Sequence, residues 1–289
     1  MSTDPVVEPT GLKRNALGAP SIVFLVMAAV APLTATVVVV PLAIALGNGG
    51  GVPGAFVFAS VVLLLFAIGY VQMSRHVVNA GAFYAYVTRA MGRLPGLVTA
   101  FIALVGYNTF VIGAVATTGF FTNLVFDNVL GIDLPWQAWA AVAVVFTFLL
   151  GRREVHLNAR VLGVALLLEA AILLALDVSI LVQEGFDLSA FSPDTVTADG
   201  LGLGLLFAFT CFLGFEATAI FGEEARDPRR TVARATWAAI SVIGLFYALT
   251  TLALVSAVGV TDAGAVAGED PGGFVFAISA EYLGTFLTD

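Results

Sequence analysis

Basic residues in this chain occur only in alternate gaps between long apolar segments. Lys13 and Arg14 precede the first segment. The rest of the 12 lie after the second, fourth and sixth segments: Arg75, Arg89 and Arg93; Arg152, Arg153 and Arg160; Arg226, Arg229, Arg230 and Arg234. The other gaps contain no Lys or Arg, and most carry acids. Because Lys and Arg near span ends stay on the cytoplasmic side, this pattern predicts a multi-span membrane protein with its N-terminus inside.

The apolar segments are long enough to cross a bilayer, which takes roughly 20 apolar residues per helix. Hydrophobic residues make up 60% of the chain and charged residues 11%, against about 45–50% and about 25% in soluble domains. No short segments of strict alternation suggest a membrane β-barrel. Seven spans are predicted, the fourth of them short: Pro20–Leu46, Gly54–Ser74, Leu97–Phe126, Trp136–Leu150, Val161–Val182, Leu201–Gly222 and Trp237–Val260.

These spans give a domain plan. Residues 1–19 are expected to form a disordered cytoplasmic tail, and residues 20–260 the seven transmembrane helices. Residues 261–289 are expected to form an outer loop with a short helix at Phe274–Phe286.

The first span contains prolines where a straight helix should fail. Ala31-Pro32 lies near its middle and Pro41 follows. Proline removes a backbone hydrogen bond inside a helix but suits the first position of a new one. The sequence predicts two half-helices that meet near Ala29–Thr34, and the alternative is a simple proline kink.

The sixth span contains Gly214 and Glu216 at mid-depth. A glutamate there is costly, which makes it a functional candidate, and the glycine loosens the helix. Irregular spans separated by five are expected of an inverted repeat, in which paired broken helices form a midplane site. Half-helix amino ends would bind an anionic group and opposing carbonyls a cation, so a zwitterion fits both.

Two segments resemble one known family. Gly214-Phe215-Glu216, followed by Glu223-Glu224 and by Asp227-Pro228-Arg229-Arg230, is similar to the sixth-span signature of the amino acid–polyamine–organocation permeases. Asn79-Ala80-Gly81-Ala82-Phe83-Tyr84-Ala85-Tyr86 resembles their stretch between spans two and three. The resemblance implies an all-α LeuT-type inverted-repeat fold of usually twelve spans, of which seven are present here, and transport of amino acids or amines by proton symport or exchange.

The resemblance also implies roles for individual residues. Glu216 matches a glutamate linked to gating or proton coupling, and Phe209, Thr210 and Phe212 lie where the family places an aromatic gate and substrate contacts. Ordinary packing is the alternative for the phenylalanines. Ala28–Pro32 stands where the family usually has a glycine-rich break, so the resemblance does not determine how the substrate carboxylate is bound.

Other polar residues within or beside the spans keep two interpretations each. Tyr107 and Asn108 either line the cavity or bridge helices. Glu169 is a proton carrier or an interhelical contact, whereas Asp177, nearer the outer end, is expected to meet solvent. Charged residues after the sixth span form either an inner salt-bridge gate or a solvated helix end: Glu223, Glu224, Arg226 and Asp227.

The sequence contains no motif typical of the other function classes considered. The sequence has two histidines, one cysteine, no zinc-protease motif, no nucleophile elbow and no phosphate-binding loop. Its basic residues are spread over four loops, which argues against nucleic-acid binding. We expect no enzyme activity, cofactor or metal, and expect a small-molecule substrate, the lipid bilayer and possible protons as partners.

The sequence therefore predicts a secondary transporter of amino acids or amines in the cytoplasmic membrane. The alternative is a truncated, transport-incompetent homologue acting as a scaffold or regulator, and the chain could oligomerise or need a missing C-terminal half. The predicted coupling or gating residues are Glu216, Glu169, Glu224 and Arg226. The predicted substrate-binding residues are Ala29, Val30, Ala31, Pro32, Leu33, Thr34, Tyr107, Asn108, Phe209, Thr210, Phe212 and Gly214.

Overall fold

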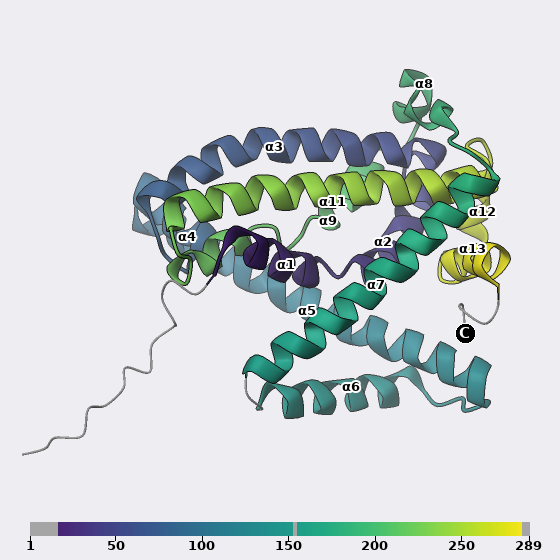
Figure 1. The fold of residues 1–289 in the computed structure, drawn as a ribbon, viewed down its shortest axis with the longest axis horizontal. Coiled ribbons are helices and arrows are strands. Elements are labelled where there is room, and N and C mark those ends of the chain that lie inside the picture. Colours follow the sequence, from purple (N-terminus) through teal and green to yellow (C-terminus); the bar gives the residue numbers. More distant parts are fainter. Residues whose placement is uncertain (1–16, 153–154, 285–289) are drawn as a thin grey trace, which may run out of the picture.

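Two long helices, packed side by side in opposite directions (Figure 1), form the centre of the structure, a computed structural model that describes residues 17–152 and 155–284. These are α3 (Val52–His76) and α11 (Pro228–Val258), which lie side by side along most of their length (Figure 1). The two helices approach each other closely at Gly244 of α11. A Cβ added there would lie only 2.0 Å from the Ser60 hydroxyl oxygen of α3, so the close contact requires a glycine. Within the described residues the fold is all-α, with one isolated β-bridge.

The first apolar segment is broken, as the sequence predicts. Helix α1 (Ala19–Val30) ends and α2 (Pro32–Leu46) begins on either side of Ala31, with a bend of 46°. Ala31 has φ 49° and ψ 71°, the left-handed conformation that ends a helix, although it carries a Cβ. Pro32 occupies the first position of α2, where its missing N–H costs nothing.

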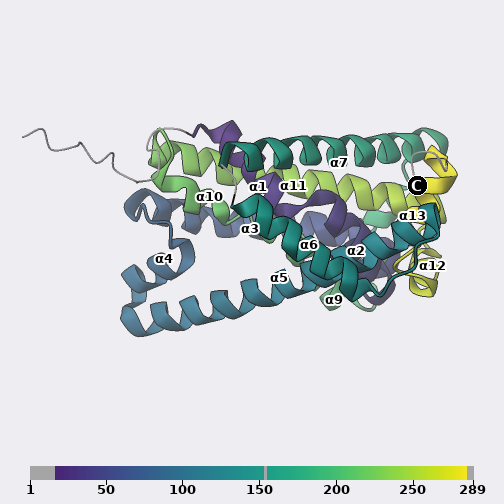
Figure 2. The same cartoon turned by 90° about the horizontal axis from the view of Figure 1, so that it is seen from below.

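A second layer lies below this pair. Helix α5 (Arg93–Leu130) packs against α6 (Trp136–Gly151) and against the short α4 (Ala82–Met91), and Figure 2 shows α5 running along one side of the molecule. Only Gly96 and Gly119 of its 38 residues are buried by the described chain. Helix α5 therefore presents most of its apolar surface to whatever surrounds the chain.

The sixth apolar segment is broken too. Helix α9 (Leu201–Thr210) ends, the chain turns through residues 211–216, and α10 (Ala217–Ile220) and a 3-10 helix (Phe221–Glu223) follow. The break coincides with the predicted Gly214 and Glu216. Helix α7 (Val155–Gln183) crosses α11 and α1.

Short helices complete the fold. They include a 3-10 turn at Gly49–Gly51, another at Leu188–Phe191, α8 (Pro193–Val196), α12 (Ala263–Glu269) and α13 (Phe274–Leu283). Helix α13 accounts for the predicted outer-loop helix up to Leu283.

Four of the described helices are long and apolar enough to cross a membrane. If α1 and α2 together form one bent span, the described residues contain five candidate spans. Helices α6 and α9 are apolar but shorter. The predicted sixth span falls short because its break divides it. The structure is thus a polytopic all-α membrane protein.

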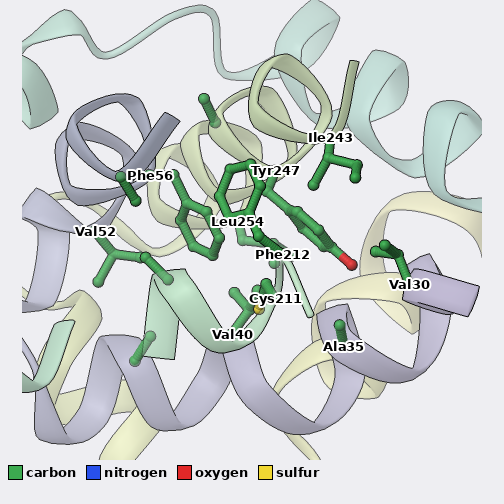
Figure 3. Packing of buried hydrophobic residues seen from close by; sticks show 14 of the residues in the cluster. Val30, Ala35, Val40, Val52, Phe56, Cys211, Phe212, Ile243, Tyr247 and Leu254 are labelled. Atoms are coloured by element: carbon green, nitrogen blue, oxygen red, sulfur yellow. The ribbon is translucent and has the colours of Figure 1, made fainter. Parts of the chain in front are cut away.

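The core fills the space between α2, α3, α9 and α11. The Tyr247 ring of α11 stacks on Phe56 of α3 with their centroids 5.4 Å apart, and Phe212 and Cys211 lie beneath them (Figure 3). All four side chains are at most 2% exposed. The residues at the second break are therefore part of the core.

Two sequence expectations need correction. Asp177 does not meet solvent: it is 4% exposed, and its Oδ2 accepts a hydrogen bond of 2.7 Å from the Thr250 hydroxyl, because α11 covers this side of α7. The seventh helix begins at Pro228, well before Trp237, because the Asp227 side chain caps it by accepting from the Arg230 N–H.

The predicted N-terminal tail lies mostly outside the described residues. Its described end is fixed at two points: Leu17 pairs with Ala225 in a β-bridge, and α1 begins at Ala19.

Candidate functional site

The two helix breaks face each other. A Cβ added at Gly214 would lie 3.4 Å from the Ala29 Cβ and 3.6 Å from the Ala29 carbonyl carbon. Gly214 has φ 109°, a conformation that side-chain-bearing residues rarely adopt. The glycine thus permits both the turn in the sixth segment and its close approach to the end of α1.

Glu216 lies at this junction and forms hydrogen bonds with the segments around it. Its Oε1 accepts a hydrogen bond from the Tyr107 hydroxyl of α5, and its Oε2 accepts one of 2.9 Å from the Gly214 N–H. Its backbone carbonyl accepts a third, of 2.7 Å, from the Tyr70 hydroxyl of α3. Glu216 is 6% exposed. A buried carboxylate needs donors, and here they come from α5 and from the break itself, while α3 binds the backbone of the same residue.

The two family-like segments meet beside Glu216. Phe83 and Tyr86 of α4 pack on Tyr70, with ring centroids 5.3 Å and 5.5 Å away, and Phe215 packs on the same ring at 6.0 Å. Burial raises the pKa of the Tyr86 phenol to about 12, so this hydroxyl stays protonated at neutral pH. The aromatic cluster therefore couples the loop helix α4 to the second break.

A cavity of about 610 Å³ opens on this side of the break, among α3, α4, α5 and α9. Its lining is mostly apolar and aromatic, and Glu216 is the one acidic or basic side chain among the described residues that line it. Five of the predicted site residues contribute to the lining: Tyr107, Phe209, Thr210, Phe212 and Glu216.

Other lining residues were not predicted from the sequence. Phe83 and Phe215 lie inside the two family-like segments, so those motifs were a signal for them, whereas Leu63 and Phe110 look like ordinary span residues. Among the polar lining residues, Thr210 donates its hydroxyl to Leu206 O of its own helix.

Comparison with known proteins places the chain in a family. The model of the family described as "Amino acid permease" matches residues 24–285. The chain belongs to the amino acid permease family.

Curated relatives of this chain are named as transporters. The uncharacterized transporters Rv1979c of Mycobacterium tuberculosis (strain ATCC 25618 / H37Rv) and Mb2001c of Mycobacterium bovis (strain ATCC BAA-935 / AF2122/97) are each 27% identical to it over 230 residues. The match covers 68% of the permease chain and 46% of each relative, so the chain spans less than half of their length.

The permease's first break lies apart from the cavity. None of Ala29, Val30, Ala31, Pro32, Leu33 and Thr34 lines it. Val30 and Pro32 are buried, whereas Ala29 and Thr34 are exposed. Asn108 is exposed as well, and its amide donates to Leu104 O of the same helix at 2.7 Å, so it neither lines this cavity nor bridges helices.

Glu169 lies at the first break. Its Oε2 accepts a hydrogen bond of 3.4 Å from the Leu33 N–H, at the amino end of α2. That end carries unsatisfied N–H groups and a partial positive charge. A carboxylate of α7 thus occupies the position that the sequence analysis assigned to a substrate carboxylate.

Two of the charged residues after the second break, Glu224 and Arg226, make backbone hydrogen bonds to the segment before α1, whereas the Glu223 side chain accepts a hydrogen bond of 2.9 Å from the Ala80 N–H. Leu17 N–H donates to Glu224 O at 3.1 Å, and Arg226 N–H donates to Leu17 O at 3.0 Å. The one ion pair within residues 17–152 and 155–284 joins Arg230 and Asp227, both well exposed. This conformation therefore lacks a side-chain ion pair between Glu224 and Arg226.

Metal ligands do not gather in the part of the chain that the structure describes. No group of three or more His, Cys, Asp or Glu side chains there could hold a metal ion.

Proposed function

We propose that this permease is a secondary active transporter that moves amino acids or related amines across the cytoplasmic membrane by alternating access. The observation that carries the proposal is the contact between the two helix breaks at Ala29 and Gly214, with Glu216 at their junction. Broken helices in a membrane persist only where protein, water or ligand satisfies the freed backbone groups. Family membership supports transport as the class of activity.

The cavity chemistry supports a substrate with an amino group. Aromatic faces and a single carboxylate attract ammonium groups, and the described lining offers no basic side chain to an acidic one. We propose Tyr107, Phe209, Thr210 and Phe212 as substrate contacts. Ala29–Thr34 and Gly214 supply backbone groups when the breaks separate.

Glu216 is the proposed gate and proton-coupling residue. Its hydrogen bonds join α5, α3 and the break. Protonation would remove its charge, weaken the contact with Tyr107 and free the break to move. Glu224 and Arg226 are proposed as inner gating residues, because their backbone holds the segment before α1.

The test is radiolabelled uptake into liposomes containing the purified protein as its gene encodes it. A mixture of amino acids and amines is screened with and without an inward proton gradient. We expect gradient-dependent accumulation, and a Glu216→Gln variant whose uptake no longer varies with pH. The matched control is Glu281→Gln, an exposed acid of α13 distant from the breaks in the sequence.

Two results would contradict the proposal. Absence of uptake for every solute class would remove the transport function. Uptake by Glu216→Gln that follows the same pH profile as the parent protein would remove the proton role of Glu216 and leave transport standing.

A further inference from the structure

The turn between α4 and α5 lies at one end of the molecule (Figure 2) and carries two arginines. Arg89 is in the last turn of α4 and Arg93 is the first residue of α5. They are four positions apart, so their Cα atoms lie within about 14 Å of each other. The two helices are in close contact here, because a Cβ added at Gly96 would lie 1.8 Å from the Thr88 hydroxyl oxygen. Residues 88–97 form the α4–α5 corner.

The positive charge of the corner is not offset by acids of its own elements. Residues 52–126, which include α3, α4 and most of α5, contain three arginines, one histidine and no Asp or Glu. Arg89 and Arg93 are exposed, and neither forms an ion pair with an acid that the structure describes. The Glu223 carboxylate binds the Ala80 N–H, beyond the opposite end of α4. Both guanidinium groups are therefore available to an anion.

Two exposed apolar side chains accompany these arginines. Met91 is 70% exposed and Leu94 is 74% exposed. The corner also lies where two candidate spans end, since one runs over Gly49–His76 and the other over Arg93–Leu130. Span ends lie near the headgroup region of a bilayer. A soluble anion would leave Met91 and Leu94 uncovered, whereas a phospholipid covers both kinds of side chain.

We propose that the α4–α5 corner binds an anionic phospholipid. Arg89 and Arg93 bind the phosphodiester, which the arginine fork recognises through paired N–H donors. Met91 and Leu94 contact the acyl chains. Basic side chains beside a membrane span attract anionic lipids, so selectivity should follow the headgroup charge. This lipid site goes beyond the proposed transport function, and it stands whichever solute the permease carries.

Contacts of α4 connect the corner to the second break. Tyr86 and Phe83 of this helix pack on the Tyr70 ring, with centroids 5.5 Å and 5.3 Å away. The Tyr70 hydroxyl donates a hydrogen bond of 2.7 Å to the Glu216 carbonyl. A lipid that holds α4 in place therefore also stabilises the second break against opening.

Binding of radiolabelled phosphatidylglycerol to the purified protein in detergent tests the site. Glycerol phosphate and unlabelled phosphatidylcholine with the same acyl chains serve as competitors, and we expect neither to displace the label at equal concentration. Arg89→Gln combined with Arg93→Gln should weaken binding by roughly 25-fold, because each basic residue near an anionic surface contributes about 5-fold. The matched control combines Arg229→Gln with Arg234→Gln, which removes the same charge from exposed positions of α11 and should bind as the parent does.

Labelling of Cys211 tests the link to the second break. This single cysteine lies in the break and is 2% exposed. Bound phosphatidylglycerol should slow its reaction with a maleimide dye in the parent and the control, but not in the variant that lacks Arg89 and Arg93, with all three eluting as folded protein. Displacement by either competitor, or equal binding in the two double variants, would overturn the lipid site. Binding that leaves the labelling rate unchanged would overturn its link to the break.

Discussion

Replacing Gly214 with alanine tests whether the second break depends on a glycine backbone. Gly214 has φ 109°, outside the ordinary left-handed region. The substitution keeps the Gly214 N–H, so the hydrogen bond to Glu216 Oε2 can still form. The new Cβ would lie 3.4 Å from the Ala29 Cβ, an ordinary contact, so steric overlap contributes little.

The expected cost is therefore the backbone strain alone. A residue with a side chain held in a sparsely populated backbone conformation costs about 1–3 kcal/mol. By the scaling for chains of 150–250 residues, each kcal/mol lowers the unfolding midpoint by roughly 2–4 °C. The same energy shifts a local opening equilibrium by about 5- to 150-fold.

Cys211 provides the assay. It is the single cysteine of the chain, lies in the same break and is 2% exposed. A maleimide dye will label it only when the break opens. The labelling rate of Gly214→Ala should rise by about the opening factor, and a thermal ramp with the same dye should report the lower midpoint.

Gly202→Ala is the matched control. Gly202 lies on α9, has an ordinary helical backbone and has no atom within 4 Å of an added Cβ. Alanine there should leave labelling unchanged or slow it, because alanine favours a helix over glycine by about 1 kcal/mol. If Gly214→Ala labels no faster than the parent, or Gly202→Ala labels equally fast, the strain argument is refuted.

Two further variants address the junction. Ala31→Gly should raise the free energy of unfolding by about 0.5–1 kcal/mol, because relief of the left-handed strain at Ala31 exceeds the added chain entropy of glycine. A lower midpoint in the thermal ramp would contradict this. Tyr107→Phe removes a donor to Glu216 and should lower the free energy of unfolding by about 1–2 kcal/mol, less than a fully buried bond because Tyr107 is 43% exposed. Denaturant titration should show this loss in Tyr107→Phe and a change within about 0.5 kcal/mol in the exposed Tyr84→Phe.

Local chemistry accounts for the parts of the site that the sequence predicted. Pro32 cannot continue α1, and Gly214 allows a turn that other residues resist, so both breaks were visible from single residues. Glu216 was visible because an acid in an apolar span is costly. These effects act within a few residues and need no knowledge of the fold.

Pairings between distant segments were not visible in this way. Tyr107 and Glu216 are 109 residues apart, and Leu33 and Glu169 are 136 apart. Either acid could have paired with many donors, and helix packing selects the one that it meets. Asp177 shows the same limit, since its position near a span end suggested solvent until α11 was seen to cover it.

The sequence by itself determined the membrane class, the helical architecture and the positions of both breaks. Apolar length, proline and glycine act locally, and the bilayer leaves a helix few alternatives. Only the tertiary structure decided that the two breaks face each other and that Glu169 binds at the amino end of α2. It alone also decided that the Tyr247 hydroxyl points toward Val30 and Ala35, on either side of the first break (Figure 3). Those arrangements depend on how helices distant in the chain pack, which no local pattern specifies.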